Sequence, residues 1–248
     1  MRLSRRAFVL GLAACPVCAG FARAESGPHW AYEGRDGVKE WGRLSSQFRT
    51  CAVGSEQSPV DLRDAIKADI GDLTVEWRPE AYKILNNGHT IQADVGVKCG
   101  ATLGRRAFTL KQFHFHTPSE HALDGARTDM EAHFVHADPQ GRLMVVGMFM
   151  KAGARHKEFA AIMATAPRKQ GAATLSAPID PAAFLPENRE RFRYEGSLTT
   201  PPCSETVDWN VFAEPIEVAA EDIAAFKALF PMNARPLQAA NRRFILKN

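Results

Sequence analysis

Long apolar runs are missing from most of this 248-residue sequence. Beyond the first 24 residues nothing approaches the ~18 apolar residues that a membrane-spanning helix needs, so we predict no transmembrane segment. Internal repeats and linkers are also absent, which favours one domain over a repeat array. Basic blocks with interleaved aromatic residues are absent too, and nucleic acid is therefore not expected as a partner.

Residues 1–24 have the composition of an export signal. A twin-arginine pattern at residues 4–10 precedes an apolar run and the small-residue site Ala22-Arg23-Ala24, so we expect cleavage before Glu25. A Sec-type signal that merely contains two arginines is one alternative, and lipoprotein processing at Cys15 is another. The mature domain would be residues 25–248, soluble and exported to a bacterial-type periplasm.

Net charge and cysteine are both scarce in that mature domain. Four of the 31 basic residues and no acidic residue lie in residues 1–24, so 27 basic residues remain against 28 acidic ones. Three cysteines also remain, namely Cys51, Cys99 and Cys203. An oxidising compartment permits one disulfide and leaves one free thiol, but the spacing alone does not choose the pair.

Short segments with alternating apolar residues dominate the rest of the chain. Strands are expected at residues 60–62, 73–77, 82–85, 89–95, 108–115, 131–137, 143–150 and 207–212, and helices at 158–166 and 219–229. Asn86-Asn87-Gly88 is a hairpin turn signal between two of these strands, and residues 28–34 should be coil held by packing. We predict a mainly β protein, predominantly antiparallel, with a few peripheral helices.

One stretch, from Gln112 to His133, has the pattern of a metal site. Successive strand residues point to opposite faces, so His114 and His116 share a face and lie ~7 Å apart along the strand. If residues 117–129 fold back antiparallel, His133 can complete a set of three histidines. Three neutral nitrogens with a fourth position open to water are typical of catalytic Zn²⁺.

The same faces also carry suitable partners for these rings. Gln112 and Glu131 each lie two residues before a proposed ligand, and metal-bound histidines usually donate their other ring N–H to such an acceptor. A lone His-x-His pair is more often simply packed in a strand. The five residues together, however, favour zinc, because a buried Gln or Glu without such a role would be costly.

A second informative stretch runs from Glu195 to Cys203 and reads EGSLTTPPC. Its two prolines exclude helix and central strand, so it should be a rigid loop that presents two threonine hydroxyls. Beside a zinc with an open position, a hydroxyl can accept the proton of a metal-bound hydroxide. Its own proton must then go to a carboxylate behind it.

These motifs resemble, in order, those of an α-class carbonic anhydrase of the bacterial exported type. The matching residues are His29-Trp30-Ala31-Tyr32, Gln57-Ser58-Pro59-Val60, Leu85-Asn86-Asn87-Gly88-His89, residues 112–116, Ser119-Glu120-His121, residues 131–136, residues 196–203 and Asn233-Ala234-Arg235-Pro236. They span nearly the whole mature chain. One departure, Thr117-Pro118 where vertebrate members have Trp after the second ligand, is common in the bacterial type.

The resemblance implies roles for individual residues. His114, His116 and His133 would hold zinc, with Gln112 and Glu131 as hydrogen-bond partners of His114 and His133. Thr199 would accept a hydrogen bond from the zinc-bound hydroxide and donate one to Glu120. The apolar wall that receives CO2 would be Val135, Val145, Leu198, Val207 and Trp209, with Thr200 lining the pocket and Tyr32 in an ordered-water network. Cys51 and Cys203 would form the disulfide, leaving Cys99 as the free thiol.

The implied activity is reversible hydration of CO2 to bicarbonate and a proton, on a large central, mostly antiparallel twisted sheet. His89 is our candidate for moving the proton out, because an imidazole pKa near ~6.5 suits transfer at neutral pH. An exposed turn histidine without a role is the alternative. His121 and His136 are interpreted as structural residues, and His29 and His156 as surface residues.

Three other functions compete with this interpretation. A related domain that has lost catalysis would be expected to lack a ligand. A zinc hydrolase acting on esters is plausible as a side activity of the same pocket. A cupin-like His-x-His protein would leave the threonine loop and Asn86-Asn87-Gly88-His89 unexplained. Composition does not distinguish a monomer from a dimer.

Overall fold

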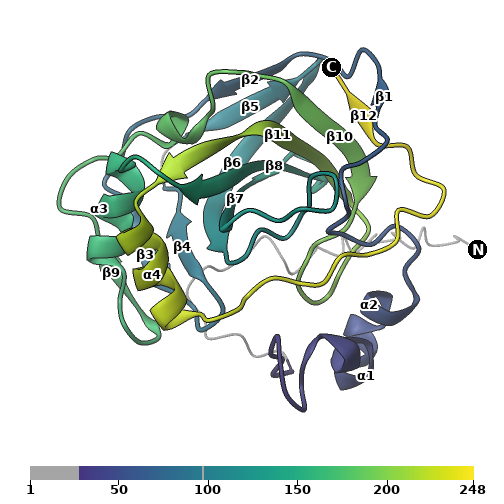
Figure 1. The fold of residues 1–248 in the computed structure, drawn as a ribbon, viewed down its shortest axis with the longest axis horizontal. Helices are drawn as coiled ribbons and strands as arrows, with labels where there is room; N and C mark the ends of the chain where they lie inside the picture. Colours follow the sequence, from purple (N-terminus) through teal and green to yellow (C-terminus); the bar gives the residue numbers. More distant parts are fainter. Residues whose placement is uncertain (1–27, 97) are drawn as a thin grey trace, which may run out of the picture.

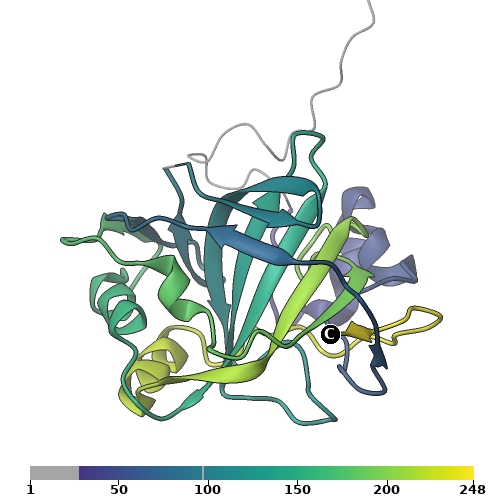
Figure 2. The same cartoon turned by 90° about the horizontal axis from the view of Figure 1, so that it is seen from above.

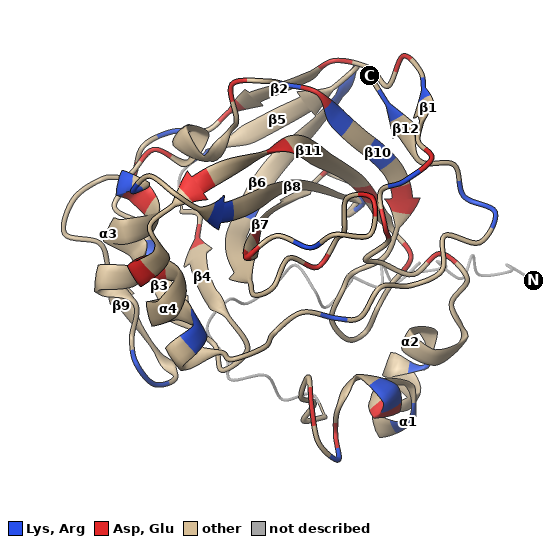
Figure 3. Ribbon diagram, viewed as in Figure 1, with Lys and Arg blue, Asp and Glu red and all other residues tan. Residues whose placement is uncertain are grey.

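The computed structural model describes residues 28–96 and 98–248. The predicted signal segment and its cleavage site lie outside the described residues. None of the described helices combines the length and apolar character that crossing a membrane requires. Lys and Arg are interspersed with Asp and Glu over the ribbon (Figure 3).

A single large sheet dominates the described residues (Figure 1). Its main path runs β1-β12-β10-β11-β8-β7-β6-β4-β3-β9, and β5 joins β2 to β6. The pairings are antiparallel except for β11 with β8 and β1 with β12, so the prediction of a mainly antiparallel β fold is confirmed. The strands are β1 (Ile66–Lys67), β2 (Leu73–Glu76), β3 (Lys83–Asn86), β4 (Ile91–Asp94), β5 (Gly100–Leu103), β6 (Arg106–His116), β7 (Met130–Ala137), β8 (Leu143–Ala152), β9 (Gly171–Thr174), β10 (Arg191–Gly196), β11 (Val207–Val218) and β12 (Leu246–Lys247).

The helices lie around the margin of this sheet (Figures 1 and 2). They are η1 (Val38–Glu40), α1 (Trp41–Leu44), η2 (Ser46–Phe48), α2 (Thr50–Val53), α3 (Lys157–Thr165), η3 (Pro181–Phe184) and α4 (Ala220–Leu229). Helices α3 and α4 lie together on one side, where Phe159 and Phe226 are buried against Phe115 of the sheet. The short helices α1 and α2 lie at a different margin.

A β-bulge in β6 decides which of its side chains face the candidate metal site. The pairing with β7 shifts between Leu110 and Gln112, so Lys111 is an extra residue in the ladder. Before the shift the even-numbered Phe108 and Leu110 enter the large apolar core, and after it the odd-numbered Phe113 and Phe115 do. Bulges re-aim the side chains that follow them. This one turns the even-numbered residues from Gln112 onward to the opposite face.

The two faces of the sheet are therefore covered by different sets of side chains. One face carries the large core with helices α3 and α4, and it includes stacked rings of Phe113, Phe134 and Trp77. The other face carries a smaller apolar cluster that includes Val145, Trp209 and Tyr194. The histidines proposed as ligands lie on this second face.

Most of the strands and helices expected from the sequence are present, and most of their ends lie within one or two residues of the predicted positions. β11 is longer than expected and ends at Val218, and residues 60–62 form only an isolated bridge between Asp61 and Ala122. The short helices between Val38 and Val53 were not predicted, and neither were β1, β5, β9, β10, β12 and η3. Those short helices have too few turns to produce a recognisable period.

Candidate metal centre

His114, His116 and His133 converge on one point of the second face. Each offers a ring nitrogen, and these nitrogens lie within 4.8 Å of one another. His114 and His116 come from β6, and His133 comes from β7, directly opposite His114 in the antiparallel ladder. The fold-back of residues 117–129 expected from the sequence therefore brings all three residues together.

Each of the three rings has one nitrogen already occupied. His114 Nδ1 bonds to Gln112 Oε1 at 2.8 Å, and His133 Nε2 bonds to Glu131 Oε1 at 2.9 Å. His116 Nδ1 bonds to the backbone oxygen of Asn233 at 2.8 Å, a partner that the sequence did not reveal. An acceptor on one nitrogen fixes the proton there and leaves the other nitrogen as a lone-pair donor.

The second ring nitrogens of these three histidines, which are not bonded to the acceptors above, are suitably placed to bind a metal ion. His116 Nε2 is buried and has no hydrogen-bond partner among the described residues, and neither does Glu120 Oε2, which lies 3.6 Å away. An unpaired buried polar atom costs free energy, so native proteins rarely keep one without a reason. Three imidazole nitrogens around an open point are a donor set that suits Zn²⁺.

The electrostatics keep the rings of His114 and His116 neutral and the Glu131 carboxylate charged. Burial lowers the pKa of His114 well below its usual value, and the neighbouring histidines lower it further. Burial also lowers the pKa of His116. Burial acts to raise the pKa of Glu131, but His121 and His133 hold it well below its usual range. Neutral imidazoles and an ionised acceptor are the states that metal binding requires.

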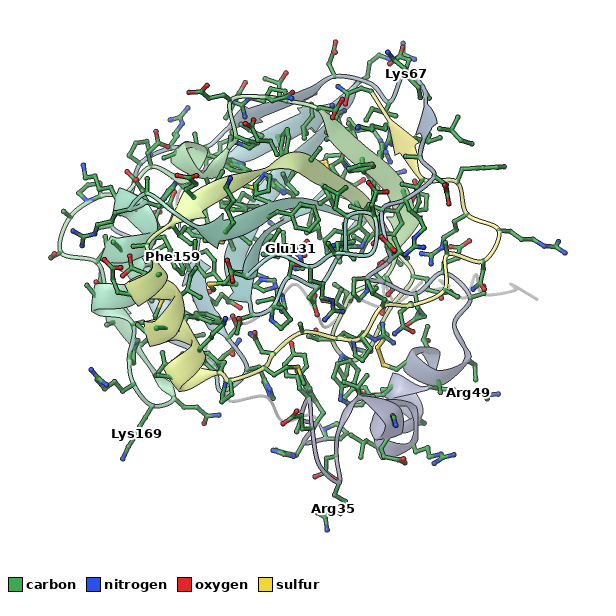
Figure 4. The ribbon with its side chains drawn as sticks, viewed as in Figure 1. Arg35, Arg49, Lys67, Glu131, Phe159 and Lys169 are labelled. Carbon is green, nitrogen blue, oxygen red and sulfur yellow. A yellow bond between two sulfur atoms is a disulfide. The ribbon has the colours of Figure 1, made fainter. Side chains whose placement is uncertain are left out.

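Glu131, labelled near the middle of the view in Figure 4, connects several groups of this site. Its Oε1 also bonds to His121 Nδ1 at 2.7 Å, and its Oε2 accepts the backbone N–H groups of Glu120 and His121 at 2.8 Å each. Gly147 lies opposite His133 on β8, and a Cβ there would come within 3.1 Å of Glu131 Oε1. The carboxylate is thus fully bonded, with little space around it.

Glu120 and Thr199 are both buried, and Glu120 lies near the ring nitrogens of His116 and His133. Glu120 Oε1 accepts the backbone N–H of Arg235 at 2.7 Å, which fixes the carboxylate and leaves Oε2 directed at the ligand rings. Thr199 is 5 % exposed, and no hydrogen bond joins its hydroxyl to Glu120. The predicted pairing of these two residues therefore stays a prediction.

The residues predicted to receive CO2 belong to one apolar cluster. Val145, Val207 and Trp209 are buried in it, and Val135 and Leu198 pack against it. Register places Val135 beside Val145 and Val145 beside Trp209, so they form a continuous patch next to His133. His133 itself contacts the Trp209 ring, with centroids 4.9 Å apart. Thr200, in the adjoining loop, is partly exposed.

His89 lies in the turn between β3 and β4, and its ring stacks on Trp30 at 3.8 Å between centroids. Burial and the nearby His29 lower its pKa. Tyr32 packs against the same tryptophan, and burial together with the carboxylate of Glu120 holds the tyrosine pKa well above its usual value. The coil at residues 28–34, expected to be held by packing, thus forms part of the site.

Two further buried histidines lie near the site. His121 joins Glu131 to the Tyr194 hydroxyl, at 2.7 and 2.6 Å, and Tyr194 continues to Ser58 Oγ at 2.9 Å. His136 lies on the other face, as parity predicted, and both its ring nitrogens are bonded, to Trp77 and to the backbone of Phe134.

Cys51 and Cys203 form a disulfide that joins α2 to the loop after Thr199-Thr200. Cys99 is a buried free thiol. The pairing that spacing alone left open is therefore the one that the family resemblance implied.

The sequence and the fold both match known proteins. The sequence profile of the eukaryotic-type carbonic anhydrases matches residues 36–248. A carbonic anhydrase from a Nostoc species is 39% identical over 246 residues, covering 96% of this chain and 93% of the relative. The carbonic anhydrase from Pectobacterium carotovorum is 38% identical, covering 91% and 93% of the two chains. The structure of the α-carbonic anhydrase from Thermovibrio ammonificans, in complex with the inhibitor sulfanilamide, superposes with a TM-score of 0.87 at 42% identity, covering 89% of this chain and 99% of that one.

The fold and the three-histidine site define an α-class carbonic anhydrase architecture. This chain belongs to the carbonic anhydrase family, whose members catalyse the hydration of CO2, a small-molecule substrate.

Proposed function

We propose that His114, His116 and His133 hold one Zn²⁺ and that the enzyme uses it for reversible hydration of CO2 to bicarbonate and a proton. The observation that carries this proposal is the set of three ring nitrogens left over after each histidine has bonded its other nitrogen. Bound zinc supplies hydroxide at neutral pH by lowering the pKa of its water to about 7.

Thr199 and Glu120 orient the attacking oxygen. With zinc bound, the Thr199 hydroxyl would accept a hydrogen bond from the metal's water-derived oxygen and would donate its own proton to Glu120 Oε2, which has no hydrogen-bond partner among the described residues. The Arg235 backbone N–H holds the other oxygen of Glu120 and so prevents the carboxylate from turning away. A preorganised acceptor of this kind would orient the nucleophile that the zinc supplies toward the substrate carbon.

CO2 lies on the apolar patch formed by Val135, Val145, Val207, Trp209 and Leu198. The patch suits an uncharged molecule without hydrogen-bond donors, because apolar surface offers no competing polar partner. Thr200 lines the wetter side of the pocket, where bicarbonate leaves. The charged product is less favourable on this wall than CO2, which helps its release.

His89 accepts the proton that hydration releases and passes it to buffer. Its lowered pKa keeps the ring neutral at pH 7, so the ring can accept a proton. Tyr32, whose hydroxyl stays protonated, helps to order the water between the metal and His89. The disulfide and the twin-arginine pattern also lead us to propose that the enzyme works in a periplasm after removal of residues 1–24.

Stopped-flow measurement of CO2 hydration, before and after chelation, tests the proposal. The purified enzyme should hold one zinc per chain, lose its hydration activity when a chelator removes the metal, and regain it when Zn²⁺ is added back. A hydration rate that does not exceed the buffer rate, or that survives complete zinc removal, would contradict the proposal.

Replacement of His89 tests the proton route. His89→Ala should lower turnover in weak buffer by about 100-fold, the lower end of the range for general acid and base groups. Added imidazole should restore it, because a soluble base can replace the missing ring. As pH falls through the lowered pKa of His89, wild-type turnover should decline, and the variant should lack that step. Unchanged turnover in weak buffer would remove His89 from the mechanism.

A further inference from the structure

Asn233 connects the metal ligands to the turn that carries His89. It lies in the coil after α4 and is 1 % exposed. Its backbone oxygen accepts His116 Nδ1 at 2.8 Å, and its backbone N–H donates to the Thr117 oxygen at 3.1 Å. Its side-chain Oδ1 accepts the N–H of Thr117 at 2.7 Å. The residue is thus fastened to the end of β6, where the second ligand lies.

The side-chain amide nitrogen reaches two other carbonyl groups. Nδ2 donates to the Phe115 oxygen at 3.0 Å and to the His89 oxygen at 2.9 Å. A primary amide has two N–H donors, and here both are used. The side chain therefore bridges the ligand strand β6 and the His89 backbone, two segments that are not adjacent in sequence.

The other contacts of His89 do not fix its position relative to the proposed metal ligands, so this depends on the Asn233 side chain. The His89 N–H donates to Asn87 Oδ1 within the turn itself, and the ring stacks on Trp30. Neither contact relates His89 to the metal ligands. Among the described residues, the hydrogen bond to the His89 carbonyl comes from Asn233, which also holds His116.

We propose that the Asn233 side chain is a positioning residue for proton transfer, which fixes His89 relative to the ligand His116. This proposal rests on the proposed role of His89 as the proton acceptor. The amide does not touch substrate, and it acts through the backbone of His89. The contact to the His116 ring is made by the backbone carbonyl and remains when the side chain is removed, whereas the side-chain bonds to His89, Phe115 and Thr117 are lost.

Asn233→Ala is the principal test. The variant should keep one zinc per chain and a kcat/KM for CO2 hydration within about twofold of wild type, because a backbone carbonyl remains for His116. Its kcat in weak buffer should fall by about 10-fold, since even small misplacements of a catalytic group are costly. Imidazole should restore that turnover.

A second readout does not depend on activity. In the zinc-free protein, NMR titration of the His89 ring should give a pKa below 6.5 for wild type, because burial in its native position lowers it. In Asn233→Ala the pKa should rise toward the ordinary value as the ring loses its burial. Wild-type values of both the His89 pKa and the weak-buffer turnover in Asn233→Ala would overturn the proposal.

Two more variants complete the experiment. Asn233→Asp keeps an oxygen for Thr117 but turns a second oxygen toward the His89 carbonyl, so it should displace His89 at least as strongly as the alanine does. Gln170→Ala is the matched control, because Gln170 is exposed and donates to Asn87 of the same turn at 3.4 Å without reaching His89. It should behave as wild type, and a loss equal to that of Asn233→Ala would contradict the proposal.

The outcomes also separate this proposal from the proposed function. If wild type shows no zinc-dependent hydration, the proposed function fails, while the His89 titration still reports whether Asn233 positions the ring. If hydration is normal and the His89 titration does not change, only the positioning role of Asn233 fails.

Discussion

The two faces of strand β7 place histidines in opposite situations. On one face His133 bonds one ring nitrogen to Glu131 and directs the other at two further histidines. On the other face, His136 bonds one nitrogen to Trp77 and the other to the backbone of Phe134. Both rings are buried to within 1 % of full burial.

The difference shows that burial alone does not leave a histidine nitrogen free to bind a metal. What separates the two rings is the number of acceptors and donors around them. His136 has a partner for each nitrogen, so it is satisfied without an ion. His133 and its neighbours have one acceptor each, which leaves three lone pairs pointing at the same place.

Removal of a ligand should have the largest effect. His116→Ala should lose stoichiometric zinc and fall to the uncatalysed hydration rate, because two histidines do not complete the zinc site. His136→Gln, on the opposite face, is the control and should keep the metal. Metal analysis of both variants tests the comparison, and stoichiometric zinc in His116→Ala would break it.

Loss of fold stability in acid should come from His136, which lies on the other face of β7. Burial lowers the pKa of His136 to about 4, whereas the unfolded chain titrates near 6.5. Between these values the unfolded state binds a proton that the folded state excludes, so the free energy of unfolding should fall by about 3 kcal/mol as pH falls from 6.5 to 4.

Urea unfolding of the zinc-free protein, at several pH values in this window, measures the effect. His136→Gln can still accept from Trp77 and donate to the Phe134 carbonyl, so it should unfold with a smaller loss of stability on acidification. The difference between the two proteins isolates His136 from the ligand histidines. Parallel pH dependence in wild type and variant would show that His136 is not the source.

Loss of an acceptor behind a ligand should have the smallest of the three effects. Glu131→Gln keeps the shape of the side chain but removes the charge that His133 faces, and should weaken zinc binding by about 10- to 100-fold. Competition with a chromophoric chelator measures this affinity, and Glu187→Gln, an exposed residue, serves as the control. Equal affinities would mean that the carboxylate charge does not support the site.

The convergence of His114, His116 and His133 was predictable because it follows from parity within strands. The prediction nevertheless depended on a bulge that the sequence did not reveal. Had the extra residue fallen at Phe115 rather than at Lys111, the two histidines of β6 would have been divided between the faces. Parity is a local rule, and it fails wherever the ladder shifts.

Partners provided by the backbone were not predictable. The Asn233 oxygen bonds His116 across 117 positions of sequence, and any residue type provides a backbone oxygen. His121 lies in a loop, where no period assigns a direction, so its bond to Glu131 also appeared only in the structure. The disulfide pair could not be chosen from spacing, because loop closure depends weakly on length.

The disulfide between Cys51 and Cys203 closes a covalent ring that contains His89, Glu120, Thr199 and the three ligand histidines. A single proteolytic cut inside that ring leaves both fragments attached to each other. The segment after Cys203 has no such protection, although it supplies Asn233 behind His116 and Arg235 behind Glu120. After one cut between residues 204 and 232, those two supports would be held to the rest of the site by noncovalent contacts alone.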